Sequence, residues 1–241
     1  MRSLLQSIAH RLGYQVNRLH SDRLGRFPFH DMQHFVQGEA PPLILDVGAN
    51  EGQTVHRFRE SFPGCVIHSF EPGVATFKKL QASIAHEAGV HAWNCALGSA
   101  VGRQTFLENT NSDMSSFLEL HKDGWGSVAT RETVEVTTVD EFLTAREIDQ
   151  VDILKSDTQG YDLEVFKGAD RAMRSNRIGL IYTELIFSEM YAGIPPFDEL
   201  YRYLSDHGFR LVSIYEFEHQ NKLAGWADAL FVNPRYPRFQ T

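Results

Sequence analysis

The sequence lacks the features that define several common classes of protein. No apolar run in its 241 residues reaches the roughly 18 residues that a membrane-spanning helix needs. The charged start, apolar stretch and small-residue cleavage site of a secretory signal are also missing. The two cysteines, Cys65 and Cys95, lie within apolar runs, which is typical of buried thiols rather than of a disulfide framework. We therefore expect a cytoplasmic protein without a transmembrane segment.

Positive charge is scarce over most of the chain. Lysine and arginine total 23 against 31 acids, so the formal net charge is −8, and a protein of this kind repels nucleic-acid backbones. Residues 1–26 are the exception, because five of them are arginines and Asp22 is their only acid. A predicted helix there carries one apolar face, made of Leu4, Leu5, Ile8, Ala9 and Leu12. This face should pack on the rest of the chain or on a second subunit in a homodimer, and contact with an anionic membrane surface is less favoured.

Short apolar runs alternate with helical patterns along most of the chain, which predicts a mostly parallel, doubly wound α/β sheet. Pro41-Pro42 marks a boundary between an N-terminal helical extension, 1–40, and a single domain, 41–241. Seven strands are predicted, at 43–47, 65–70, 90–96, 151–156, 178–185, 209–216 and 227–232. Helices are predicted at 54–61, 75–86, 163–173 and 197–207. A short link joins the last two strands, so they should pair antiparallel.

The region between residues 98 and 139 interrupts this alternation. Two short strands, 104–107 and 134–139, flank a polar loop at 109–130. A loop of this length inside a compact domain is usually functional, and a lid over the site is one such function.

The most informative motif is the stretch LILDVGANEGQT, residues 43–54. An apolar strand ends in Asp46 and runs into a turn that contains Gly48 and Gly52, and a helix follows. The next predicted strand ends in a second acid, Glu71. Doubly wound sheets bind ligands at the carboxyl ends of their strands, where an acid at the position of Glu71 accepts hydrogen bonds from a ribose.

The spacing of the glycines narrows the choice of cofactor. A dinucleotide fingerprint reads G-x-G-x-x-G and directs a helix N-terminus at a pyrophosphate. Here the turn reads G-A-N-E-G, and Glu51 would place a negative charge beside that pyrophosphate. S-adenosylmethionine, which has a ribose but no phosphate, suits this turn better.

Several motifs together resemble the FkbM-type S-adenosylmethionine-dependent methyltransferases. They are LDVGANEGQT, HSFEP, the ALG of residues 96–98, the Ser115-Ser116 pair and VDILKSDTQGYDLEVFKGA. The resemblance extends from about residue 43 to about 232 and implies a class I (Rossmann-like) methyltransferase fold, with seven strands of which one is antiparallel. It also implies methylation of a hydroxyl on a sugar, polysaccharide or natural product. The expected cofactor-binding residues are Asp46, Gly48, Asn50, Gly52, Glu71, Pro72, Ala96, Leu97 and Ser115.

The chain departs from the family pattern after the predicted strand 151–156. The usual K-x-D-x-E-G-x-E is matched by Lys155 and Asp157, but Gln159 replaces an acid and Asp162 shortens one. A carboxylate role at position 159 is therefore in doubt, although the glutamine still reaches hydrogen-bond partners.

Asp157 and Glu184, at the ends of two neighbouring strands, are the predicted catalytic residues. They could share the acid–base work on the acceptor hydroxyl, or hold a Mg²⁺ ion through their oxygens. In the structural alternative, Asp157 caps the following helix and Glu184 pairs with Lys155.

Five further residues are candidates for contact with a small-molecule or glycan acceptor: His121, Trp125, Gln159, Trp226 and Asp228. Three other functions stay open at this point. They are N-methylation of an amino sugar, hydride transfer by a nicotinamide enzyme, and adenosyl-cofactor binding without catalysis. The sequence does not name the acceptor.

Overall fold

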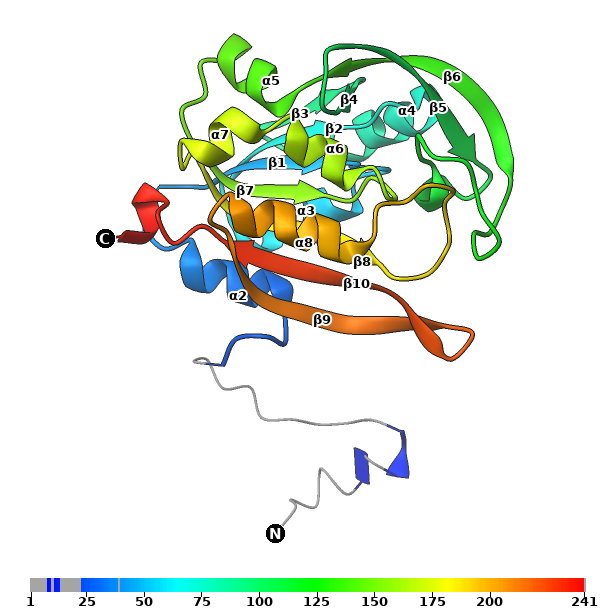
Figure 1. Ribbon diagram of the computed structural model, residues 1–241. Helices are drawn as coiled ribbons and strands as arrows, with labels where there is room; N and C mark the ends of the chain where they lie inside the picture. Colours follow the sequence, from blue (N-terminus) through cyan, green and yellow to red (C-terminus); the bar gives the residue numbers. More distant parts are fainter. Residues whose placement is uncertain (1–7, 10, 14–22, 39, 241) are drawn as a thin grey trace.

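The computed structural model describes residues 8–9, 11–13, 23–38 and 40–240, and its centre is a seven-stranded sheet (Figure 1). The strand order is β3-β2-β1-β7-β8-β10-β9, and only β10 runs antiparallel to its neighbours. The strands are β1 (Leu43–Val47), β2 (Val66–Phe70), β3 (Val90–Trp93), β7 (Val151–Ser156), β8 (Ile178–Ile186), β9 (Arg210–Gln220) and β10 (Leu223–Val232). The predicted fold class is confirmed. The predicted helix of residues 4–12 falls largely outside the described residues.

Helices cover both faces of the sheet (Figure 1). One layer contains α5 (Val139–Ala145), α6 (Asp162–Lys167), α7 (Asp170–Arg174) and α8 (Phe197–Asp206). The other contains α2 (Pro28–Phe35), α3 (Gln53–Ser61) and α4 (Val74–Ser83). The central strand β7 is buried along its whole length, including its polar residues Asp152, Lys155 and Ser156.

Helix α2 packs against this domain although it lies in the predicted extension. Its Met32 is fully buried in the core beside α3. Its Asp31 is also fully buried, and accepts hydrogen bonds from the Tyr215 hydroxyl at 2.9 Å and from the Gly25 amide at 2.6 Å. Residues 28–36 thus contribute to the same core, while the domain boundary at residue 41 stays a prediction.

The region between residues 96 and 137 forms a second sheet of order β4-β6-β5. Its strands are β4 (Ala96–Leu97), β5 (Gly102–Asn109) and β6 (Val128–Thr137), with a short 3₁₀ helix, η1 (Ser112–Met114), in the loop. The predicted single strand 90–96 is therefore wrong. The Asn94 amide donates to the carbonyls of Glu71 and Pro72, both at 2.9 Å, and the chain leaves the main sheet there.

One strand prediction and one helix prediction also need correction. The predicted strand 134–139 ends at Thr137, because the Thr138 hydroxyl accepts from the Glu141 amide at 3.0 Å and caps α5. The predicted helix 163–173 is divided into α6 and α7 at Gly168. A Cβ there would lie 2.0 Å from the Gly98 carbonyl oxygen, so this close approach requires glycine.

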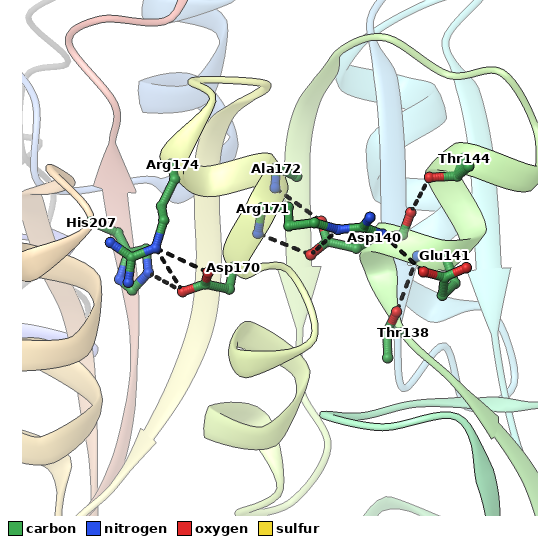
Figure 2. A network of polar contacts seen from close by, with 9 residues as sticks. All are labelled: Thr138, Asp140, Glu141, Thr144, Asp170, Arg171, Ala172, Arg174 and His207. Atoms are coloured by element: carbon green, nitrogen blue, oxygen red, sulfur yellow. Dashed lines mark hydrogen bonds and ion pairs between the residues drawn. The ribbon is translucent and has the colours of Figure 1, made fainter.

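A helix-junction network joins α5, α7 and the end of α8 (Figure 2). It comprises Asp140, Glu141, Asp170, Arg171, Arg174 and His207. The Asp140 carboxylate accepts from the Arg171 and Ala172 amides, both at 2.9 Å, and so satisfies the first turn of α7. The Asp170 carboxylate accepts from the Arg174 guanidinium at 2.9 Å and lies 2.8 Å from the His207 Nε2.

Two further features of the molecule are its cysteine thiols and the length of its helices. Cys65 and Cys95 are free thiols, and burial raises the pKa of Cys95 to about 11. None of the described helices combines the length and the apolar character needed to cross a bilayer.

Candidate active site

The glycine turn after β1 brings the ends of β1 and β7 into contact. Gly48 has φ +71°, and a Cβ there would lie 1.9 Å from the Asp157 carbonyl oxygen, so only glycine fits. Gly52, with φ +96°, begins α3, and its Cβ would meet the Leu80 side chain at 3.2 Å. The turn is thus shaped by close contact with the Asp157 backbone at Gly48 and with the Leu80 side chain of α4 at Gly52.

A buried ion pair supports this turn from below. The Lys155 ammonium lies 3.1 Å from an Asp46 oxygen and donates to the Gly48 carbonyl at 2.8 Å. Asp46 is fully buried. Since Asp46 is directed at Lys155 beneath the turn, it braces the backbone that a ligand would contact.

Glu71 is fixed at the end of β2 by two backbone amides. Its Oε2 accepts from the Asn50 amide at 3.1 Å and its Oε1 accepts from the Gly73 amide at 2.9 Å. Burial raises the pKa of Glu71 to about 7, although these two hydrogen bonds oppose the shift. Each oxygen retains a lone pair for a ligand.

A glycine-turn cavity of about 610 Å³ opens above these residues. Its walls come from the ends of β1, β2, β4 and β7 and from the loop around η1. They are Val47, Gly48, Asn50, Phe70, Glu71, Pro72, Ala96, Leu97, Phe106, Ser112, Asp113, Ser115, Phe117, Asp157, Thr158 and Gln159.

Most of the predicted cofactor-binding residues line this cavity, and two do not. Gly48, Asn50, Glu71, Pro72, Ala96, Leu97 and Ser115 are on its walls. Asp46 and Gly52 lie beneath the turn and beside α4. Two buried wall atoms, the Asn50 Oδ1 and the Thr158 Oγ1, have no hydrogen-bond partner among the described residues. Unsatisfied polar atoms on a cavity wall fit a site that receives a polar ligand.

The two predicted catalytic acids lie together and share one hydrogen-bond donor. The Gln159 Nε2 donates to the Asp157 Oδ1 at 2.8 Å and to the Glu184 Oε2 at 3.0 Å. Burial, followed by the charge of Asp157, raises the pKa of Glu184 well above its usual range.

The structural alternative for these two acids is wrong in both parts. Helix α6 has no side-chain cap at its N-terminus, and its first residue, Asp162, accepts from the Thr158 amide at 3.1 Å and from the Ser156 hydroxyl at 2.5 Å. Lys155 pairs with Asp46 and not with Glu184. Asp157 therefore does not cap the helix, and Glu184 does not form an ion pair with Lys155.

An acidic cavity of about 400 Å³ lies on the other side of Asp157. Among the residues that the structure describes, Asp157 alone lines both this cavity and the glycine-turn cavity. The Tyr182 hydroxyl donates to the Asp228 Oδ2 at 2.5 Å, and burial raises the pKa of Asp228. The lining residues are Phe29, Thr54, Arg57, Lys155, Ser156, Asp157, Tyr182, Thr183, Glu184 and Asp228.

The predicted acceptor contacts divide into two groups. Gln159 and Asp228 line the two cavities. His121 has a half-exposed ring whose Nδ1 lies 3.5 Å from a Glu189 oxygen. Trp125 and Trp226 pack against each other at 5.3 Å between ring centroids, beside a small apolar cluster. These last three residues do not line either cavity.

Sequence reasoning missed several wall residues. Phe106 and Phe117 face the glycine-turn cavity from β5 and the loop, and Phe29, Arg57 and Tyr182 line the acidic cavity. Phe29 carries no local signal, because α2 reaches the site only after it packs on the sheet. The two-residue period of a strand could have indicated Tyr182, which lies two residues before Glu184 and therefore on the same face of β8.

The same side chains do not form a metal site. No group of three or more His, Cys, Asp or Glu side chains within the described ranges is arranged to hold a metal ion. Asp157 and Glu184 both accept hydrogen bonds from an amide nitrogen that lies between them. This donor set does not fit a Mg²⁺ ion, which requires oxygen ligands at about 2.0–2.1 Å.

The strand order, with one antiparallel strand next to the edge, and the cavity above the first two strand ends define a class I S-adenosylmethionine-dependent methyltransferase. The family model of the methyltransferase FkbM domain matches residues 46–211. The chain therefore belongs to the FkbM methyltransferase family, and the nicotinamide alternative is excluded.

Characterised relatives are similar over part of the chain. The 2-O-methyltransferase NoeI of Sinorhizobium fredii is 24% identical over 64% of this chain and 68% of its own. The hexuronic acid methyltransferase AglP of Haloferax volcanii is 26% identical over 67% of this chain and 61% of its own. The 31-O-demethyl-FK506 methyltransferase FkbM of Streptomyces tacrolimicus is 28% identical over 50% of this chain and 45% of its own. Two of these three alignments span less than two thirds of the relative.

Proposed function

We propose that the chain methylates a hydroxyl group of a sugar or of a glycosylated natural product, with S-adenosylmethionine as the methyl donor. The observation that carries this proposal is the position of Asp157, which lines both cavities. A methyl donor in one cavity and an acceptor in the other would meet at this carboxylate.

The glycine-turn cavity suits an adenosyl group. Glu71 is held by two backbone amides and would accept the two ribose hydroxyls. Ala96 and Leu97, with Phe106 and Phe117, supply apolar surface for a base. Asn50 and Thr158 have buried oxygens left to bind the polar part of the ligand.

The acidic cavity suits a polyol. Asp157, Glu184 and Asp228 offer oxygens that accept hydrogen bonds, and Thr183 and Tyr182 add hydroxyls. A sugar presents several hydroxyl donors on a small frame. The names of the relatives NoeI and AglP, a 2-O-methyltransferase and a hexuronic acid methyltransferase, support the same class of acceptor.

The mechanism follows from the placement of the two carboxylates. The cofactor supplies the methyl group as an electrophile, and the protein must align the acceptor hydroxyl and take its proton. Asp157 is the base in this proposal, because it stands where the two cavities join. Glu184, whose pKa is raised well above its usual range by burial, would orient a second hydroxyl.

A binding and turnover experiment tests this function. We expect S-adenosylhomocysteine to bind in a calorimetric titration, whereas NAD should not bind. A panel of sugars and uronic acids, incubated with S-adenosylmethionine, should yield a product heavier by one methyl group that survives the conditions that cleave esters. Absence of S-adenosylhomocysteine binding would remove the proposal, and binding without turnover on any acceptor would favour a noncatalytic module.

A further inference from the structure

The side chain of Gln159 occupies the position between the two catalytic carboxylates. Its amide nitrogen is 2.8 Å from the Asp157 Oδ1 and 3.0 Å from the Glu184 Oε2. Its amide oxygen accepts from the Tyr191 hydroxyl at 2.7 Å. Because ionised carboxylates only accept hydrogen bonds, the nitrogen end of the amide faces Asp157 and Glu184, and its oxygen end is left to accept from Tyr191.

The backbone of Gln159 is held as firmly as its side chain. The residue has φ +55°, a left-handed conformation that is unusual outside glycine. Its carbonyl accepts from the Ser116 hydroxyl at 2.8 Å. At the next residue, Gly160, a Cβ would meet Ile194 and Leu118 at 3.1 to 3.2 Å. The Gln159 bridge, which is its side-chain amide between Asp157 and Glu184, is therefore held by three segments. They are the turn after β7, the loop after η1 and the segment after β8.

We propose that Gln159 is a positioning residue that joins Asp157 and Glu184 in the manner of a bound cation, so that methyl transfer at this site needs no divalent metal. The proposal rests on the proposed function, since it assigns Asp157 as the base. Two close carboxylates repel each other unless a proton, a cation or a donor lies between them. An amide provides two hydrogens of partial positive charge at that place, and it adds no oxygen ligand for a metal.

The bridge also orients the base. Gln159 engages the Asp157 Oδ1, and the Asp157 Oδ2 has no hydrogen-bond partner among the described residues. One oxygen is thus used for placement and the other is left for the acceptor hydroxyl. Tyr191 acts one step further away, because it fixes the amide and does not contact either carboxylate.

Three variants separate this role from plain structural support. Gln159→Glu keeps the shape of the side chain but replaces the amide, with its two donor hydrogens, by a third carboxylate group. Gln159→Met keeps the length and removes the donors without adding charge. Tyr191→Phe leaves Gln159 in place and removes the bond that orients it. Thermal unfolding and circular dichroism check that each variant is folded.

The first measurement needs no acceptor. Manganese binding, followed by the electron paramagnetic resonance signal of free Mn²⁺, should be absent in the parent protein and should appear at one ion per chain in Gln159→Glu. Stoichiometric Mn²⁺ binding by the parent protein would overturn the proposal, and so would a Gln159→Glu variant that folds and binds no Mn²⁺.

The second measurement uses an acceptor found by the panel. Turnover of the parent protein should be unchanged by a chelator and by added Mg²⁺. Gln159→Met should lower kcat at least tenfold and move the acidic limb of the pH–rate profile to higher pH, with Tyr191→Phe showing a smaller effect in the same direction. A parent enzyme that is inactivated by the chelator, or a Gln159→Met variant with an unchanged pH profile, would refute the role of Gln159. Neither result would affect the methyltransferase proposal, which fails only if the parent protein binds no cofactor or methylates no acceptor.

Discussion

Two groups of carboxylates in this molecule have opposite surroundings, and the pKa shifts found in them have opposite directions. In the helix-junction network, Asp140 accepts from two backbone amides, and Asp170 contacts Arg174 and His207 (Figure 2). The hydrogen bond from Arg174, and then that from His207, lowers the pKa of Asp170. At the carboxyl ends of the strands, burial instead raises the pKa of Glu71 and Glu184.

The difference separates carboxylates that stabilise the fold from carboxylates that are kept for a ligand. Those of the helix-junction network have donors directed at them, so their charge is satisfied within the chain. Glu71 and Glu184, at the two cavities, are buried so deeply that burial outweighs the donors they have, and their pKa values are raised while lone pairs remain for a ligand. Buried acids of this kind, gathered at a cavity, are typical of functional sites.

The largest expected effect comes from Asp157. Asp157→Asn removes the proposed base with little change in shape, so we expect kcat to fall by roughly 10²–10⁴. Binding of S-adenosylhomocysteine should stay within a few-fold of the parent value. The matched control is Asp140→Asn, which alters a carboxylate of the helix-junction network and should leave kcat nearly unchanged. Equal losses of kcat in both variants would contradict the division into carboxylates that stabilise the fold and carboxylates that act in catalysis.

The next effect is a dependence of stability on pH that originates in Glu71. Its folded pKa of about 7 exceeds the usual value, so the folded state holds a proton that the unfolded state releases. In the ligand-free protein this contribution is complete below about pH 4.5 and is lost as pH rises through 7. It amounts to roughly 3 kcal/mol of unfolding free energy, since one pKa unit corresponds to about 1.4 kcal/mol. Urea titrations at several pH values should show this slope in the parent protein and a flatter one in Glu71→Gln.

Glu71 should also determine the affinity for the cofactor. Glu71→Ala removes charge-assisted hydrogen bonds to the ribose, each of which contributes about 1.5–3 kcal/mol. We expect the Kd of S-adenosylhomocysteine to rise at least tenfold at pH 8. The parent affinity should itself increase between pH 6 and pH 8, as Glu71 loses its proton. An unchanged Kd in calorimetry would show that the ribose lies elsewhere.

A smaller effect is expected in the helix-junction network. Asp140→Ala leaves two amides at the start of α7 without their acceptor, so we expect a loss of about 1–2 kcal/mol of unfolding free energy. Chemical unfolding followed by circular dichroism measures this loss. Cofactor affinity measured in the same preparation should be unaffected, and a large change in affinity would mean that the network is coupled to the site.

The cofactor half of the site was far easier to predict from the sequence than the acceptor half. The strand, the glycine turn and Glu71 lie within thirty residues, and their chemistry is carried by backbone geometry that local sequence specifies. The acidic cavity draws on residues from α2, α3, β7, β8 and β10. Phe29 and Asp228 have no common motif, and only packing of these elements brings them together.

The errors in the predicted elements have the same origin. At Asn94 and Gly168 the local pattern favours continuation of a strand and of a helix. Side-chain bonds from Asn94 to the end of β2, and contact of Gly168 with Gly98, end them instead. These partners are distant in sequence, so no local propensity reports them.

By itself the sequence determined the class of sheet, the glycine turn and the acids at the strand ends, because strand periodicity, glycine conformation and strand-end chemistry are all local. Only the tertiary structure decided what those acids do. It placed Asp46 beneath the turn against Lys155, and it put Asp157 between two cavities. It also set the Gln159 amide between Asp157 and Glu184, through Tyr191 and Ser116 from two other segments. Hydrogen bonds across such separations form only when the sheet has assembled, and they distinguish a carboxylate that stabilises the fold from one that is available for catalysis.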